Sequence, residues 1–101
     1  MAQKPETVFR QKVDILLSKI PNSWWESIQQ KTIRGTPDKI GCINGKFVAL
    51  ELKASYLSEP SHLQEYKLKE ISSSGGVGFV LYPENLADVM KRLMEMGTDS
   101  L

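Results

Sequence analysis

The chain has 101 residues, enough for one domain with a single modest core and too few for two. Hydrophobic residues make up 41% of it and charged residues 25%, values typical of a globular protein and not of a disordered one. The net charge of +1 neither indicates nor excludes a nucleic-acid partner, because a cluster of carboxylates would hide a basic surface in the total.

The cysteine and histidine content limits the kind of metal site. A single cysteine, Cys42, and a single histidine, His62, exclude a disulfide framework, a cysteine-rich zinc site and a multi-histidine site. A bound metal would be held by carboxylates, backbone carbonyls and water, which favours a hard cation such as Mg²⁺ or Mn²⁺.

No membrane or export segment is evident in the sequence. No apolar run approaches the roughly 20 residues that span a bilayer, and the first ten residues lack the apolar core of a signal peptide. We therefore expect an intracellular, cytoplasmic protein with no membrane partner.

The first predicted element is a helix over residues 5–20, where apolar side chains recur mostly at helical spacing and Pro21 prevents continuation. Residues 22–34 are less regular and predict a short irregular strand or two. They contain Trp24 and Trp25. At least one of these indole rings is expected to pack in the core or at a subunit interface, and stacking on bases is the alternative.

The remaining elements follow from turn and cap signals. Two β-rich runs in residues 38–54 flank Asn-Gly, the dipeptide that most strongly favours a two-residue hairpin loop. SHLQ at 61–64 matches a capping box and predicts a helix that ends at the Ser-Ser-Ser-Gly-Gly tract. Residues 77–82 predict a buried strand and residues 84–96 an amphipathic helix. The order α-β-β-β-α-β-α indicates an α/β fold with a small mixed sheet flanked by helices.

The hairpin loop determines which residues of its two strands face one another. With the loop at residues 44–45, counting away from the loop along both strands brings Asp38 opposite Glu51. Lys53 lies on the same face, because residues two apart on a strand point the same way. A divalent cation between the carboxylates would remove their repulsion, and Lys53 beside it would orient a water or steady a phosphate. The alternative is a solvated face on which Lys53 neutralises two splayed carboxylates.

These motifs resemble those of a known nuclease group. GTPD at 35–38 and ELK at 51–53 are similar to the PD-(D/E)XK superfamily, in which an Asp and a Glu-x-Lys on adjacent strands hold Mg²⁺. Over nearly the whole chain, the order of motifs resembles the VRR-NUC family of virus-type replication and repair nucleases. The matching motifs are Glu6, GTPD, INGKFVALELK, Gln64 and GGVGFVLY. The resemblance implies a restriction-endonuclease-like core and a single VRR-NUC-type domain over residues 1–101.

The resemblance also implies roles for the residues of the centre. Asp38 and Glu51 match the metal-binding carboxylates, and the backbone carbonyl of Leu52 matches a further ligand. Lys53 matches the catalytic lysine. Glu6 matches an acidic residue that reaches the metal directly or through water, and its alternative role is a favourable charge in the first helical turn.

Residues around the centre have weaker assignments. Gln64 matches a glutamine that approaches the active site, a role compatible with its place in the capping box with Ser61. Arg34 is expected to contact the scissile phosphate and Lys31 the nearby backbone, and the alternative for either residue is solvated surface. His62, beside a helix start, is expected to be exposed and not a general base.

The implied activity is Mg²⁺-dependent hydrolysis of DNA phosphodiester bonds, with Mn²⁺ expected to substitute. The enzyme would be an endonuclease selective for DNA structure, cutting branched or junction-like DNA or nicking a duplex, in repair, recombination or a phage context. RNA and free ends are left open as targets. The alternative is a non-catalytic nucleic-acid-binding protein that retains the nuclease fold. We also expect a homodimer, for which these side chains would supply apolar surface: Trp24, Trp25, Met90, Met94 and Met96.

Overall fold

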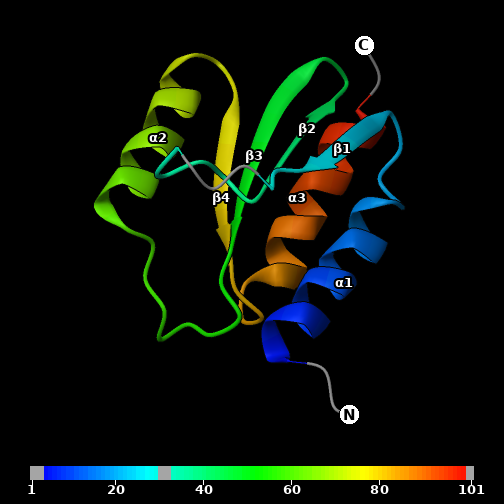
Figure 1. Cartoon of the computed structure of the whole chain (residues 1–101). Coiled ribbons are helices and arrows are strands. Elements are labelled where there is room, and N and C mark those ends of the chain that lie inside the picture. The colour runs from blue at the N-terminus through cyan, green and yellow to red at the C-terminus, as the bar shows by residue number, and fades with distance from the viewer. Residues whose placement is uncertain (1–3, 30–32, 100–101) are drawn as a thin grey trace.

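The structure, a computed structural model, describes residues 4–29 and 33–99 (Figure 1). The helices in this part of the chain are α1 (Pro5–Leu17), α2 (His62–Ser73) and α3 (Leu86–Thr98), and the strands are β1 (Ser23–Ser27), β2 (Lys39–Ile43), β3 (Lys46–Leu52) and β4 (Val77–Leu81). The strands form one sheet in the order β1-β2-β3-β4, antiparallel except for the parallel pair β3 and β4. The predicted α/β class, mixed sheet and element order are all confirmed.

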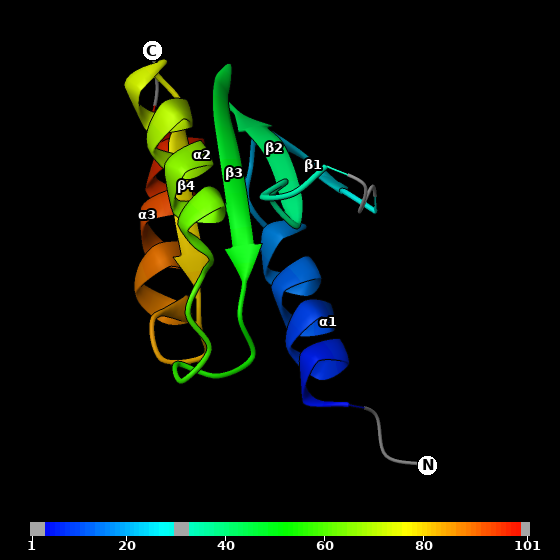
Figure 2. The same ribbon diagram turned by 60° about the vertical axis from the view of Figure 1, so that its left-hand side comes forward.

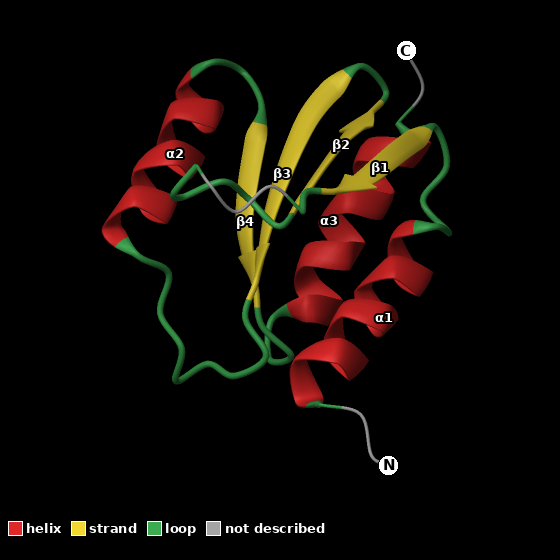
Figure 3. Ribbon diagram, viewed as in Figure 1, coloured by secondary structure: helices red, strands yellow, loops and turns green. Residues whose placement is uncertain are grey.

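Helices lie on both faces of this sheet (Figure 3). Helices α1 and α3 supply the apolar side chains that pack on one face, while α2 covers β3 and β4 on the other. The buried core between the sheet, α1 and α3 consists of Phe9, Val13, Leu17, Ile20, Ile43, Val48, Leu50, Leu81, Leu86, Val89 and Leu93. No helix in the described ranges has both the length and the hydropathy that crossing a bilayer requires.

Asn44 and Gly45 form the predicted hairpin turn. Their φ angles are +48° and +82°, the left-handed values that a type I′ turn needs at both central positions. The pairing set by this turn continues without interruption to Lys39 opposite Leu50, which confirms the predicted register along both strands.

Helix α2 begins at the predicted capping box. The Gln64 amide N–H donates to Ser61 Oγ at 3.1 Å, and the Ser61 N–H donates to Gln64 Oε1 at 2.8 Å. The helix lies very close to the sheet at Gly78, where an added Cβ would be 2.9 Å from Leu68. A long loop at the lower end of the sheet connects β3 to this helix (Figure 2). The first turn of α1 lies at that same end (Figure 1).

Three helix boundaries differ from the predicted ones, namely the end of α1 and both ends of α3, which extends to Thr98 instead of residue 96. Helix α1 ends at Leu17 instead of residue 20, because the next residues form a tighter turn in which the Ile20 N–H donates to the Leu17 carbonyl. Helix α3 begins at Leu86, two residues later than predicted. The Asn85 side chain accepts a 2.7 Å bond from the Tyr82 N–H and so holds the turn that follows β4.

The hairpin turn gives a test of the fold. Gly45→Ala should lower the free energy of unfolding by about 1 kcal/mol, because an L side chain is strained at positive φ. Gly45→Asn should lose less, since asparagine tolerates this conformation. Urea unfolding measures both. Equal stability of the alanine variant and the parent would contradict the turn assignment.

Candidate active site

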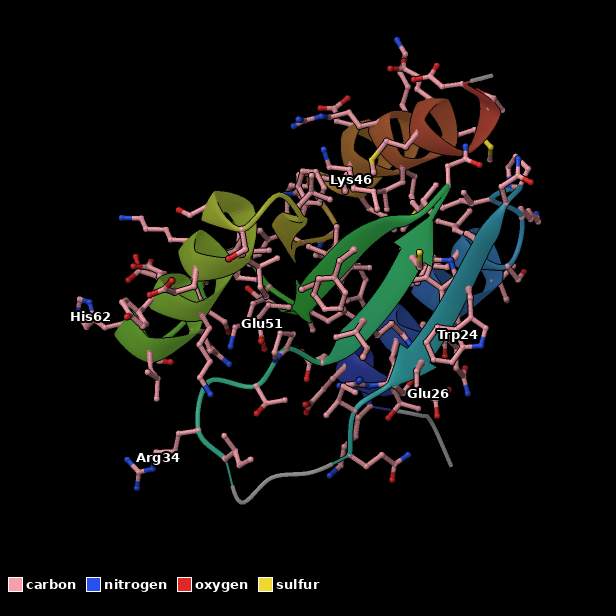
Figure 4. All side chains as sticks on the ribbon, turned by 90° about the horizontal axis from the view of Figure 1, so that it is seen from above. Trp24, Glu26, Arg34, Lys46, Glu51 and His62 are labelled. Atoms are coloured by element: carbon pink, nitrogen blue, oxygen red, sulfur yellow. The ribbon has the colours of Figure 1, made fainter. Side chains whose placement is uncertain are left out.

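Counted away from the hairpin turn, Lys39 and Leu50 are the last paired residues of β2 and β3. Asp38 and Glu51 are the next residues beyond this pair. They are buried, with 8% and 3% of their surface exposed. By strand alternation, Glu51 lies on the face that α2 covers, and Figure 4 shows its side chain on that side of the sheet. Two acidic side chains are therefore buried at one end of the sheet, Asp38 directly before β2 and Glu51 near the end of β3.

The Asp38 side chain is held by two elements. Its Oδ2 accepts a 2.8 Å hydrogen bond from the backbone N–H of Leu52, and its Oδ1 lies 3.8 Å from Nη2 of Arg10 on α1. The Asp38 backbone carbonyl accepts a 2.8 Å bond from the Ile28 N–H just beyond β1. The Leu52 N–H and Arg10 therefore hold the carboxylate, while the Ile28 N–H holds the backbone of Asp38. Arg10 was not predicted as a site residue.

Lys53 lies directly after β3, on the same side as Glu51. Its Nζ is 3.9 Å from Oε1 of Glu51, and its backbone N–H donates to the Leu81 carbonyl at 2.8 Å. The ammonium group is therefore held beside the carboxylate by continued pairing with β4. The structure places Lys53 beside Glu51 and the Asp38 carboxylate against the backbone of Leu52, the residue between them, and their chemical roles stay predictions.

A cleft of about 430 Å³ opens beside this group, between the first turns of α1 and the segment after β3. Three of the predicted site residues, Glu6, Leu52 and Lys53, share this cleft, although Glu6 itself is exposed. The complete lining is Pro5, Glu6, Phe9, Arg10, Leu52, Lys53, Ala54, Ser55 and Ser58. Arg10 and Lys53 both line the cleft, and each also lies beside a buried carboxylate. Arg10 lies beside Asp38 and Lys53 beside Glu51.

The GTPD loop is pressed against the start of α2. Gly35 has a φ of +78°, and a Cβ there would lie 2.8 Å from Cγ of Leu63. Lys67 Nζ also donates to the Arg34 carbonyl at 2.5 Å. These contacts set the direction in which the chain approaches Asp38.

Of the other predicted residues, Gln64 and His62 lie on α2, and Arg34 lies directly before the GTPD motif. Gln64 is half-buried, and because its oxygen serves the helix cap, its NH₂ group is the part that can donate elsewhere. Arg34 is exposed and points away from the sheet (Figure 4). His62 is also exposed, as predicted, and points away from the sheet. Lys31 lies outside the described residues.

The donor set decides which metal would fit. Among the residues that the structure describes, no three acidic, histidine or cysteine side chains are grouped closely enough to hold a metal ion. The site offers two carboxylates and nearby backbone carbonyls. This set fits Mg²⁺, which retains several waters and takes one or two carboxylates, and does not fit a structural zinc site, which needs four protein ligands.

Comparison with known proteins identifies the fold. A solved structure described as "VRR_NUC domain protein" superimposes with a TM-score of 0.71 over 100% of both chains, at 13% sequence identity. The chain has the fold of a VRR_NUC domain protein. No family model matches the sequence, and no curated protein is similar to it. The fold expected from the GTPD and ELK motifs is therefore confirmed by similarity of structure.

The bond between Asp38 and Leu52 gives a second prediction. Asp38→Ala and Asp38→Asn remove the same charge, but only asparagine keeps an oxygen that can accept from the Leu52 N–H. The alanine variant should therefore unfold with a free energy about 1 kcal/mol lower than the asparagine variant. Urea unfolding of the two variants in chelator measures the difference. Identical stabilities would mean that the bond contributes nothing.

Proposed function

We propose that the protein is a metal-dependent nuclease that hydrolyses DNA phosphodiester bonds at the cleft between α1 and the end of β3. The observation that carries the proposal is the pair of buried carboxylates, Asp38 and Glu51, beside Lys53. Like charges opposite one another destabilise a sheet, and burial raises that cost. A cation-binding role explains why both are retained. The VRR_NUC fold supports the same reaction class.

The ligands that we assign to Mg²⁺ are Asp38, Glu51 and the backbone carbonyl of Leu52, with Mn²⁺ able to replace it. Glu6 lines the adjoining cleft and would add a ligand directly or through water. A divalent ion held there would supply Lewis-acid chemistry, polarising the phosphate and making water a better nucleophile.

The chain's own groups would orient and stabilise the reacting atoms. Lys53, held next to Glu51, would donate to the phosphate or to the attacking water and offset the negative charge that develops in the transition state. Gln64 would donate from the α2 side through its NH₂ group. The Leu52 N–H would keep Asp38 in one orientation throughout.

The proposed substrate is DNA inside the cell, cut by an endonuclease selective for branched or junction-like structure or for nicking a duplex. Repair, recombination or phage replication would be its context. Arg34, exposed beside the GTPD motif, and Lys31 would contact the DNA backbone. The non-catalytic alternative fits less well, because carboxylates near a phosphate repel it unless a cation is present.

Three substitutions separate metal binding from chemistry. Asp38→Ala or Glu51→Ala should abolish Mn²⁺ binding and cleavage together, because each removes a ligand that hard cations need. Lys53→Ala should still bind Mn²⁺ while the chemical step slows by about 100-fold or more. Calorimetric titration with Mn²⁺ measures the first property. Single-turnover cleavage of linear, nicked, flapped and four-way DNA in Mg²⁺ measures the second.

Lys69→Ala, which removes an exposed lysine of α2, is the matched control and should behave as the parent does. Cleavage by Lys53→Ala at the parent rate would overturn the role of Lys53. A parent protein that binds DNA but cuts none of the four substrates would favour the non-catalytic alternative.

The proposed active form is a homodimer. Trp24, Cys42 and Phe47 stand opposite one another on β1, β2 and β3, so that they form a row across the sheet. Trp24 is 59% exposed and Phe47 42% exposed. Figure 4 shows Trp24 projecting outward from β1. This apolar row is the surface that a second copy would cover.

Only some of the apolar residues expected at the interface are exposed. Trp25, Met90 and Met96 pack against the core, because β1 and α3 turn these side chains inward. Trp24 and Met94 are exposed, as a role in an interface requires.

Light scattering at micromolar concentration, without DNA, tests the dimer. The parent should have twice the 11.4 kDa mass of one chain. A Trp24→Ser, Phe47→Ser double variant should be monomeric and folded, since both side chains are exposed. Tyr56→Ser removes an exposed aromatic side chain elsewhere and should stay dimeric. A monomeric parent would refute the dimer.

A further inference from the structure

One face of α1 carries three charged residues at four-residue spacing, so that they align along the helix. Glu6 lines the cleft, Arg10 lies beside Asp38, and Asp14 forms an ion pair with the buried Lys39 of β2. The helix therefore meets the end of the sheet through charged side chains over three successive turns. Glu6 has a place in the proposed function, whereas Arg10 has none yet.

Arg10 lies between the buried carboxylate and open space. Its side chain is 42% exposed, whereas that of Asp38 is only 11% exposed. Arg10 lines the cleft that contains Lys53, and it also borders a second cleft of about 420 Å³ formed with Asp14, Ser27 and residues 28–29. The guanidinium group is therefore not confined to its contact with Asp38, because there is room for it to turn.

The two oxygens of Asp38 have different surroundings. Oδ2 accepts from the Leu52 N–H, while Oδ1 is the oxygen that faces Arg10. A divalent cation at Asp38 would lie close to this guanidinium, and two positive charges at one carboxylate repel each other. In the protein without metal, the same guanidinium offsets the cost of a buried negative charge.

We infer that Arg10 is a counter-ion of Asp38 in the metal-free protein and turns to a DNA phosphate in the cleft when a divalent ion binds. The inference rests on the proposed function. Once the ion neutralises Asp38, and with Asp14 already paired with Lys39, a phosphate in the cleft is an acceptor whose oxygens match the planar fork of the guanidinium. Metal and DNA then strengthen each other's binding, because both favour the same position of Arg10.

Arg10→Gln tests the inference, with Lys12→Gln as the matched control on an exposed position of the same helix. In the absence of DNA, Arg10→Gln should bind Mn²⁺ several-fold more tightly than the parent, because the competing charge is gone. DNA affinity, measured with Mn²⁺ in a Lys53→Ala background that does not cut, should fall about tenfold, with a salt dependence shallower by about one unit. Lys12→Gln should change neither property.

Arg10→Lys distinguishes charge from shape. A lysine restores the positive charge beside Asp38, so Mn²⁺ affinity should return towards the parent value. It lacks the two-pronged donor geometry, so DNA affinity should recover only in part. In the Lys53→Ala background, Mn²⁺ should increase DNA affinity more when Arg10 is present than in Arg10→Gln. Thermal unfolding of each variant verifies that the fold is intact.

The outcomes separate this inference from the proposed function. If the parent neither binds Mn²⁺ nor cuts DNA, the nuclease proposal fails and the role of Arg10 fails with it. If the parent does both, but Arg10→Gln binds Mn²⁺ with equal or lower affinity, only the counter-ion role is overturned. Unchanged DNA affinity in Arg10→Gln would overturn the phosphate contact.

Discussion

The two-residue turn at Asn44-Gly45 determines the register of β2 and β3, and the candidate site depends on that register. A slip by one residue would move every side chain of β3 to the opposite face. Glu51 would then enter the core of α1 and α3 side chains, and Leu50 would lie beneath α2. Burial of an unpaired carboxylate in that core would cost several kcal/mol. The turn that forms the hairpin therefore also places the carboxylates.

Around this hairpin, the site is assembled from parts distant in sequence. The backbone of β3 orients Asp38, α1 supplies Arg10 and Glu6, and α2 presses the GTPD loop into place through Leu63. Each contributing segment also has a structural task, such as the helix cap that Gln64 shares with Ser61. In a chain of 101 residues, the side chains proposed for function thus also contribute to stability.

The parts of the fold that follow local rules could be predicted from the sequence. The hairpin turn, the capping box and the register of β2 with β3 as far as Lys39 and Leu50 depend on backbone geometry over a few residues, and these signals are specific. Helix ends were predicted less well. Asn85 looks like an early part of α3, but its side chain is engaged with the end of β4, a contact that no local pattern indicates.

Arg10 could not be found in this way, because its contact with Asp38 depends on how α1 docks against the sheet. Its four-residue spacing from Glu6 is a usable signal only once Glu6 has been placed near the site. The methionines of α3 show the same limit. Met90 and Met94 are both compatible with an amphipathic helix, and packing places Met90 against the core while Met94 is 37% exposed.

The ion pair between Asp14 and Lys39 has a consequence for the geometry of α1. An apolar helix face can slide or rotate against a sheet at little cost, because dispersion contacts have no strong directional preference. A buried ammonium group that also donates to Ser27 at 2.5 Å allows no such freedom. Rotation of α1 by one residue, about 100° around its axis, would leave the Lys39 charge buried without its carboxylate. The pair therefore specifies the rotation of the helix about its axis. It thereby also sets the direction in which the preceding turn presents Arg10.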